Sequence, residues 1–293
     1  VFNEVAGGEP SPDALRDFIQ YVYGDGDSPL RYVLLVGDSV TISKYKTYLP
    51  AYSYLQSGQH ANDNFFANFE KPDGPPAFAV GRFSVRTTEQ LRNAIDKVIA
   101  YESGADPSDW RNTVLLIAAS VSWAEKDARE IGNTAFTPGF RIRMLDTDQQ
   151  TTDPDYAEKI NAELMSLINP GNLITVFLGH GGGTVWEVGP TRNHDNFVRH
   201  LFDQSHVERM TNTNRWPLVF ALTCYTNDFD NAHVSQTLGE TFVNSPNGAI
   251  AVIGAAQRTY VMKNREYMNK FLELLREERF ERLGDYFAEA KRA

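Results

Sequence analysis

Short apolar runs alternate along this chain with segments whose apolar positions recur at helical spacing. The runs have the length and β-branched content of strands, and lie at residues 32–38, 77–82, 114–119, 141–145, 173–178, 216–222 and 249–254. Helices are expected between them, at residues 11–23, 87–102, 123–136, 155–170, 204–210 and 236–243 and over most of the remainder. This alternation predicts an α/β protein with mostly parallel sheets that helices cover on both faces.

Local sequence signals indicate where a helix begins and where the chain divides into two subdomains. Thr87 is an expected N-cap, and the helix after it has apolar residues at Leu91, Ile95, Val98 and Ile99. A polar linker near residues 103–109 divides the pattern into an N-terminal α/β subdomain, 1–110, and a second subdomain, 111–293. The chain begins with Val1 and stops within a charged helical pattern, so we expect a domain taken from a longer precursor, with a pro-segment and further domains as possible partners.

Two strand ends carry the most informative chemistry. The only cysteine, Cys224, follows the apolar run 216–222, and His180 follows the run 173–178, 44 positions earlier. Ligands in open α/β sheets bind outside the carboxyl ends of the strands. If the two strands are neighbours, a thiol and an imidazole meet at one edge of the sheet, as a cysteine nucleophile and its base require.

The alternative reading of both residues is structural. A lone cysteine is often a small buried apolar side chain, and a histidine after a strand is often packed in the core. Two features favour a catalytic role for Cys224 and His180. Cys224 comes after its strand and before the polar turn 225–228, and His180 lies between Gly179 and Gly181, which allow close backbone approach.

Composition excludes several classes of protein. The 293 residues carry a net charge of −10 without a cluster of lysine and arginine, which disfavours nucleic-acid binding. No apolar stretch approaches the length of a membrane span. The single cysteine leaves the redox compartment open. The sequence contains no Gly-x-Ser-x-Gly elbow, Walker loop or dinucleotide fingerprint, so we expect no required cofactor.

The order and spacing of these motifs resemble the gingipain family of cysteine peptidases, within the group of caspase-type fold that includes legumain and separase. The resemblance spans roughly residues 10–275 and is carried by 32–38, 80–84, 179–181, Trp186, 210–220, Cys224 and 248–254. It implies two stacked α/β subdomains with mostly parallel sheets flanked by helices, the second caspase-like. It also implies a bacterial protein that is secreted or on the cell surface and acts on proteins or peptides.

By the same resemblance, Cys224 is the nucleophile and His180 the general base and acid of an endopeptidase that works through a thioester. The backbone N–H groups of Gly181 and Cys224 would form the oxyanion hole. Two alternatives stay open. The dyad could serve a transpeptidase, as in the family's sortase of type IX secretion, where an amine intercepts the acyl-enzyme, or the chain could be a catalytically silent surface module that binds a partner.

One position departs from the family pattern. Gingipains have an acidic residue near the histidine where this chain has Val121. Either the dyad works without a third member, or Glu125 or Asp127 reaches it from the next turn. The same two acids are also candidates to bind a basic side chain at P1, the residue before the scissile bond. Acids at a solvated helix start are favoured by the helix dipole in any case.

The remaining candidates concern metal and substrate. Asp63, Asp228 and Asp230 lie in loops rich in oxygen ligands, where a structural calcium ion could bind, although turn chemistry explains such loops as well. Trp186 and Tyr260 are expected to wall the substrate cleft, and a plain core role for Trp186 stays open.

Overall fold

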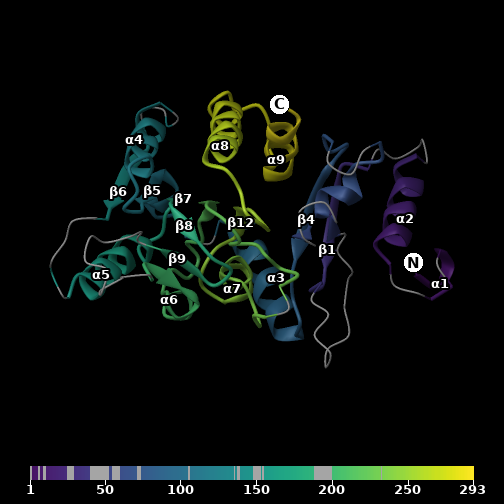
Figure 1. Cartoon of the computed structure of the whole chain (residues 1–293), viewed down its shortest axis with the longest axis horizontal. Helices are drawn as coiled ribbons and strands as arrows, with labels where there is room; N and C mark the ends of the chain where they lie inside the picture. Colours follow the sequence, from purple (N-terminus) through teal and green to yellow (C-terminus); the bar gives the residue numbers. More distant parts are fainter. Residues whose placement is uncertain are drawn as a thin grey trace. The chain divides into compact units, whose positions relative to one another are not determined.

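The computed structural model describes the chain outside residues 1, 6, 9–10, 25–29, 40–52, 55–59, 71–73, 105, 135, 137–138, 148–152, 154, 188–199 and 232 (Figure 1). Contacts among residues divide the chain into two compact units. Unit 1 contains 1–86, 229–232 and 266–293, and unit 2 contains 87–228 and 233–265. The composition of residues 41–76, rich in Tyr, Asn, Gly and Pro, predicts an irregular stretch, and more than half of these residues lie outside the described ones.

A five-stranded sheet forms the centre of unit 2. Its strands are β5 (Thr113–Ala118), β6 (Arg141–Asp146), β7 (Ile174–Leu178), β11 (Leu218–Leu222) and β12 (Ala251–Gly254). They lie in the order β12-β11-β7-β5-β6, and every pair is parallel. The predicted α/β class and the predicted strands are confirmed. The three inner strands read as continuous apolar runs because both of their faces are covered.

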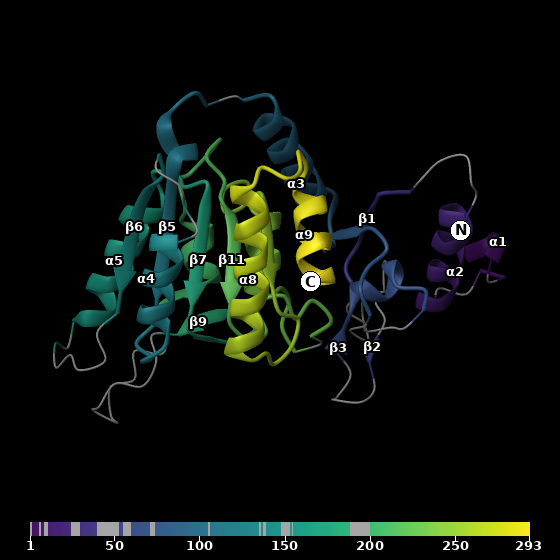
Figure 2. The same cartoon turned by 90° about the horizontal axis from the view of Figure 1, so that it is seen from above.

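Helices cover both faces of this sheet. The helices of unit 2 are α3 (Thr88–Glu102), α4 (Ala124–Thr134), α5 (Tyr156–Ile168), α6 (Gln204–Glu208), α7 (Leu238–Asn244) and the start of α8 (Val261–Arg276), with the 3₁₀ turn η3 (Asp109–Asn112). Figures 1 and 2 show α4 on one face and α5, α6 and α7 on the other. Thr87 caps α3 as predicted, in a capping box with Gln90.

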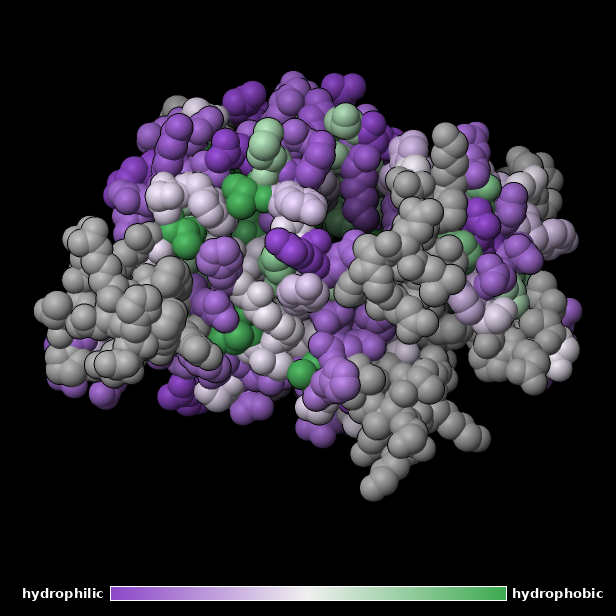
Figure 3. Space-filling model, in the orientation of Figure 1, coloured by the Kyte–Doolittle hydropathy of each residue, from purple (hydrophilic) through white to green (hydrophobic). Residues whose placement is uncertain are grey.

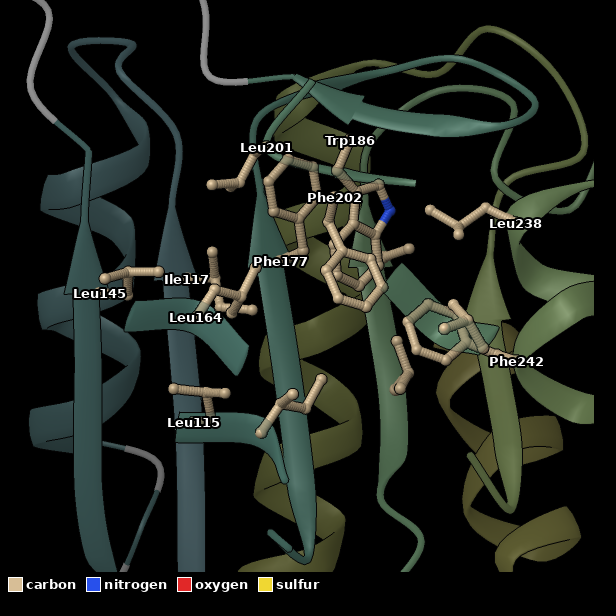
Figure 4. Close-up of a cluster of buried hydrophobic side chains, with 14 of the residues drawn as sticks. Leu115, Ile117, Leu145, Leu164, Phe177, Trp186, Leu201, Phe202, Leu238 and Phe242 are labelled. Atoms are coloured by element: carbon tan, nitrogen blue, oxygen red, sulfur yellow. The ribbon is translucent and has the colours of Figure 1, made fainter. Parts of the chain in front are cut away.

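The main core lies on the α5–α7 face of the sheet (Figure 4). Successive side chains of a strand point to opposite faces, so Leu115 and Ile117 of β5 enter this core while Leu116 faces α4 and contacts the turn around Gly132. Aromatic rings fill the centre of the core. They are Phe177, Trp186, Phe202 and Phe242, all with no exposed surface. The tight packing fixes the strand ends where the candidate chemistry lies.

A small antiparallel sheet was not predicted. It consists of β8 (His180–Gly181), β9 (Val185–Glu187) and β10 (Phe202–Asp203), in the order β10-β9-β8. Each strand has only two or three residues, too few to show the alternation by which a strand is recognised in sequence. This sheet nevertheless controls the backbone of His180, because β8 begins at that residue.

Unit 1 contains a two-stranded parallel sheet of β1 (Tyr32–Val36) and β4 (Ala79–Phe83). Its other elements are α1 (Phe2–Val5), α2 (Pro12–Gly24), β2 (Ser53–Tyr54), β3 (His60–Ala61), the 3₁₀ turn η2 (Asp63–Ala67), the rest of α8 and α9 (Leu283–Arg292). Leu15, Ile19, Leu35, Phe65 and Phe66 share its core. The apolar run 32–38 indicates a buried strand, which is wrong for Leu34 and Val36, since both are exposed.

Two other expectations differ in detail from the structure. On α3 the expected apolar face included Ile95 and Ile99, yet both are exposed, while Ala94 and Lys97 are buried. The expected division at residue 110 does not coincide with the contact units, which place 87–110 in unit 2 and 266–293 in unit 1. Contacts do not test independent folding, so the domain boundary stays a prediction.

On the face shown in Figure 3, hydrophobic atoms occur in small separate groups among hydrophilic ones. Among the residues that the structure describes, no helix combines the length and the apolar character needed to span a bilayer.

Candidate active site

His180 and Cys224 leave neighbouring strands at the same edge of the sheet. β7 and β11 are adjacent and parallel, and Leu178 pairs with Leu222 in register. His180 lies two residues beyond Leu178, and Cys224 lies two residues beyond Leu222. The adjacency of the two strands that the sequence predicted is therefore present, and the two candidate side chains start from equivalent backbone positions.

The loops that follow the two strands touch each other. A Cβ atom placed on Gly181 would lie 2.8 Å from the Thr223 hydroxyl oxygen and 3.0 Å from the Thr223 methyl carbon. Gly179 is equally confined, because its Cβ would lie 2.4 Å from the Cβ of Ala119. Both glycines beside His180 are required by close packing. This packing holds the histidine loop against the residue before the cysteine.

Cys224 is half-buried, and the described contacts of its sulfur are with Thr259. The Thr259 N–H donates to Sγ at 3.4 Å, and the Thr259 carbonyl oxygen lies 3.7 Å from Sγ. Tyr225, the next residue, has φ = 62°, in the left-handed region that non-glycine residues seldom occupy. Strain of this kind is often concentrated at functional sites.

His180 is exposed and is paired across the small sheet with Glu187. Directly opposite residues of an antiparallel pair present their side chains on one face of the sheet, with Cβ atoms roughly 4.5–5.5 Å apart. The next pair is Gly181 with Trp186, whose ring enters the core, so His180 and Glu187 occupy the opposite, outer face. Sequence reasoning missed Glu187, because only the β8–β9 hairpin brings it to the histidine.

Trp186 does not line a substrate cleft. Its side chain has no exposed surface and stacks on Phe177 with 4.5 Å between ring centroids and 7° between ring planes (Figure 4). Its indole N–H donates to the Thr226 hydroxyl at 3.3 Å. The expectation of a substrate contact is wrong for this residue, because it is completely covered, and the alternative core role is confirmed. Tyr260 is 69% exposed and follows Thr259, the residue that contacts Cys224.

The two acids of α4 are both engaged by arginines. Glu125 is exposed and accepts a hydrogen bond from Arg129 at 3.0 Å. Asp127 is buried and bound by Arg265, with Nε to Oδ2 at 3.0 Å and Nη2 to Oδ2 at 2.6 Å. If either carboxylate acts in catalysis or substrate binding, it acts together with the arginine that binds it.

The three aspartates considered for calcium lie in different surroundings. Both carboxylate oxygens of Asp63 accept hydrogen bonds from Arg82, each at 2.7 Å. Asp228 is buried and its N–H donates to the Tyr225 carbonyl, whereas Asp230 is half-buried. Within the described ranges, no three histidine, cysteine or acidic residues are grouped so that they could hold a metal ion. Calcium binding stays a prediction.

The parallel sheet carries an imidazole and a thiol at one carboxyl edge, which fits the expected class, the proteins of caspase-like fold. Within that class the sequence matches the profile described as peptidase family C25 over residues 1–293, and the chain belongs to this family. The recognised resemblance to gingipain-like cysteine peptidases is thereby confirmed.

The chain is similar to several gingipains of Porphyromonas gingivalis. It is 25% identical to Gingipain R2 over 281 residues, which cover 89% of this chain and 33% of that protein. It is also 25% identical to Lys-gingipain W83 over 254 residues, covering 84% of this chain and 13% of that protein. The chain thus spans about a third or less of these relatives.

Solved structures show the same fold. The crystal structure of the Arg-specific cysteine proteinase gingipain R aligns with a TM-score of 0.76 at 21% identity, covering 99% of this chain and 64% of that one. A complex of the Porphyromonas gingivalis RgpB pro- and mature domains aligns with a TM-score of 0.72 at 20% identity, covering 99% of this chain and 65% of that one. The predicted caspase-like fold is confirmed.

Proposed function

We propose that this chain is the catalytic part of a cysteine endopeptidase, with Cys224 as the nucleophile and His180 as the general base and acid. The observation that carries the proposal is the in-register pairing of β7 with β11, which starts both side chains from equivalent positions at one sheet edge. The half-buried thiol and the exposed imidazole also fit these roles, because substrate must reach both groups.

In the proposed mechanism, His180 accepts the thiol proton, and Sγ of Cys224 attacks the scissile carbonyl carbon. The tetrahedral oxyanion is held by the backbone N–H groups of Gly181 and Cys224, and the loss of one such donor costs about 2.7–4 kcal/mol. His180 then gives its proton to the leaving amine as the C–N bond breaks, which leaves a thioester on Cys224. Water, deprotonated by His180, attacks the thioester and releases the acid and the thiol.

The Gly181 backbone suits this role for a reason that the sequence did not supply. The close approach of Gly181 to Thr223 brings the backbone after the histidine beside the backbone that leads into Cys224. Two N–H donors from these neighbouring loops can therefore point at one oxygen atom. Among the described residues, no backbone carbonyl accepts the Cys224 N–H.

We propose protein or peptide substrates and a location outside the cytoplasm, following the resemblance to gingipains. A pro-segment is a further proposed partner, since the related RgpB structure is a complex of pro- and mature domains. Catalysis by a thiol and an imidazole needs no cofactor. A bound calcium ion would act on stability, so calcium should raise the melting temperature relative to a chelator without being needed for the chemical step.

The direct test uses an epoxide or acyloxymethyl ketone probe of cysteine peptidases and a peptide library. The purified chain should incorporate the probe at Cys224 and cleave peptides, and His180→Ala should abolish both. His200→Ala is the matched control, because His200 is an exposed histidine whose described ionic contact is with Asp203. Cys224→Ala should abolish activity and keep the parental circular dichroism spectrum.

Three results would redirect the proposal. If an added amine ends up joined to the peptide in place of water, the dyad serves transpeptidation. Labelling of Cys224 that persists at the parental rate in His180→Ala would remove the histidine from the mechanism. Absence of any labelling or cleavage, with an intact fold, would identify a silent binding module.

A further inference from the structure

A buried hydrogen bond joins the two segments that carry the candidate dyad. We call residues 180–187 the histidine hairpin, because they begin with the imidazole, and residues 224–227 the nucleophile turn, because they begin with the thiol. The indole N–H of Trp186, near the end of the hairpin, donates to the hydroxyl of Thr226 in the turn at 3.3 Å. The separation between the two segments therefore depends on where this donor and this acceptor are held.

The donor is held by the core. Trp186 stacks on Phe177 and lies 5.5 Å, between ring centroids, from both Phe202 and Phe242 (Figure 4). A ring that is packed on several sides cannot turn without opening a gap in a close-packed interior. An indole N–H can only donate, so the packing of Trp186 defines one position at which an acceptor oxygen is required.

The acceptor is held by the backbone around it. Thr226 has no exposed surface, and its carbonyl oxygen accepts the Gly239 N–H at 2.9 Å, at the start of α7. A Cβ atom on Gly239 would lie 2.8 Å from the same carbonyl oxygen, so the contact is close. The backbone N–H groups on either side of Thr226 donate to the carbonyl oxygens of Gln257 and Ala255 at 3.2 and 3.0 Å.

These contacts divide the support of the nucleophile turn between two parts of unit 2. The backbone bonds attach the turn to α7 and to the segment after β12, neither of which carries the imidazole. The Thr226 hydroxyl attaches it to the hairpin that does. Loss of this hydroxyl leaves the first attachment in place and removes the second, and it leaves a buried indole N–H without its acceptor.

We propose that Thr226 is a positioning residue of the dyad, whose hydroxyl holds the nucleophile turn where the His180 imidazole can take the thiol proton of Cys224. This inference rests on the proposed peptidase function and goes beyond it. Thr226 is completely covered and acts through the turn, without touching the substrate. It therefore affects the rate of the chemical step and leaves the binding of substrate unchanged.

Substitutions at Thr226 separate the hydroxyl from the shape of the side chain. Thr226→Val keeps the branched shape and removes the hydroxyl, so kcat should fall by about tenfold while KM stays within about twofold. Thr226→Ser keeps the hydroxyl and should retain most of the parental kcat. Thr241→Val is the matched control, because it removes another buried threonine hydroxyl of unit 2, which donates to the Thr237 carbonyl oxygen at 2.8 Å. It should keep the parental kcat.

Trp186→Phe tests the same bond from the donor side, and it keeps the proposal testable if Thr226→Val fails to fold. This variant should also lower kcat. Adding Thr226→Val to it should cause no further fall, because both substitutions remove one interaction. The indole ¹H–¹⁵N resonance of Trp186 gives a readout besides activity. It should shift in Thr226→Val and stay near its parental position in Thr226→Ser.

The outcomes distinguish this inference from the function on which it rests. A folded Thr226→Val with the parental kcat, or an equal loss in Thr226→Ser, would overturn the positioning role and leave the peptidase intact. If the parent cleaves nothing, but probe labelling of Cys224 needs His180 and slows in Thr226→Val, the positioning role is supported and the peptidase is overturned. Labelling that is absent, or independent of both residues, would overturn both.

Discussion

Gly181 packs against Thr223 so closely that a Cβ atom on residue 181 would lie 2.8 Å from the threonine hydroxyl oxygen. The hydroxyl itself has no hydrogen-bond partner among the described residues and is buried. The contact therefore depends on shape, and it sets the spacing between the loop that carries the imidazole and the loop that carries the thiol.

Gly181→Ala should reduce kcat/KM by about 100-fold, because the clash separates the two loops and small displacements at a reacting centre are costly. Thr223→Ala removes the two nearest atoms that the new methyl group would meet, whereas the Val185 carbonyl oxygen, 3.1 Å away, remains. The double variant Gly181→Ala/Thr223→Ala should recover part of the lost rate relative to the Thr223→Ala background. Peptide kinetics on all four proteins measure this coupling, and additive losses would show that the contact does not set the geometry.

Glu187→Gln should lower kcat by about tenfold with little change in KM. Glu187 stands opposite His180 in the β8–β9 pair, where a carboxylate can fix the orientation of the imidazole and stabilise its charged form. Glu187→Asp, which keeps the charge, should retain more activity than the glutamine variant.

The control for Glu187 is Glu130→Gln, an exposed acid of α4. Melting temperatures should be equal across these proteins, since Glu187 belongs to a short surface hairpin. A fall in stability without any change in kcat would make Glu187 structural.

Residues 32–38 and 173–178 show what sequence predicts about this fold and what it does not. Both runs form parallel strands as expected, because length and β-branched content report the conformation of the backbone. Burial is a tertiary property, and the exposure of Leu34 and Val36 depends on partners that a local pattern does not specify.

The candidate site likewise has residues that the sequence predicts and residues that it does not. Cys224 and His180 follow recognisable strands, and their shared edge could be predicted from the rule for parallel sheets. Glu187 becomes a neighbour of His180 only through a hairpin of very short strands, and Asp127 meets Arg265 across 138 positions of sequence. Such contacts leave no periodic signal.

Trp186→Ala should lower the free energy of unfolding by about 3–5 kcal/mol, because the ring fills the centre of the core and a cavity would remain. Tyr260→Ala should change stability by about 0.5 kcal/mol or less, since its ring is exposed. If Tyr260 contacts substrate, its loss raises KM. Chemical denaturation and peptide kinetics on both variants check this contrast, which equal destabilisation would contradict.

Lys97 should make stability depend on pH. Burial lowers the pKa of its ammonium group from 10.5 to about 7, although the group donates to the carbonyl oxygens of Phe242 and Ala249 at 3.1 and 2.8 Å. Between about pH 7 and 10.5 the unfolded chain holds a proton that the folded chain has lost, so this group makes stability rise with pH across that window, by at most about 5 kcal/mol.

Lys97→Met should remove that rise. Its absolute stability also changes, because the carbonyl groups lose their donor, so the informative quantity is the slope of unfolding free energy against pH. A parental slope in the methionine variant would show that Lys97 keeps its proton in the folded protein.

The order of strands β12-β11-β7-β5-β6 has a consequence for how the molecule is made. On the ribosome, β5 and β6 emerge first, and β7, β11 and β12 can then be added one after another to a single growing side. The sulfur of Cys224 acquires its Thr259 contacts only after this last strand has emerged. In a nascent chain, the Cys224 thiol therefore lacks its Thr259 contacts until nearly the end of unit 2 has been translated.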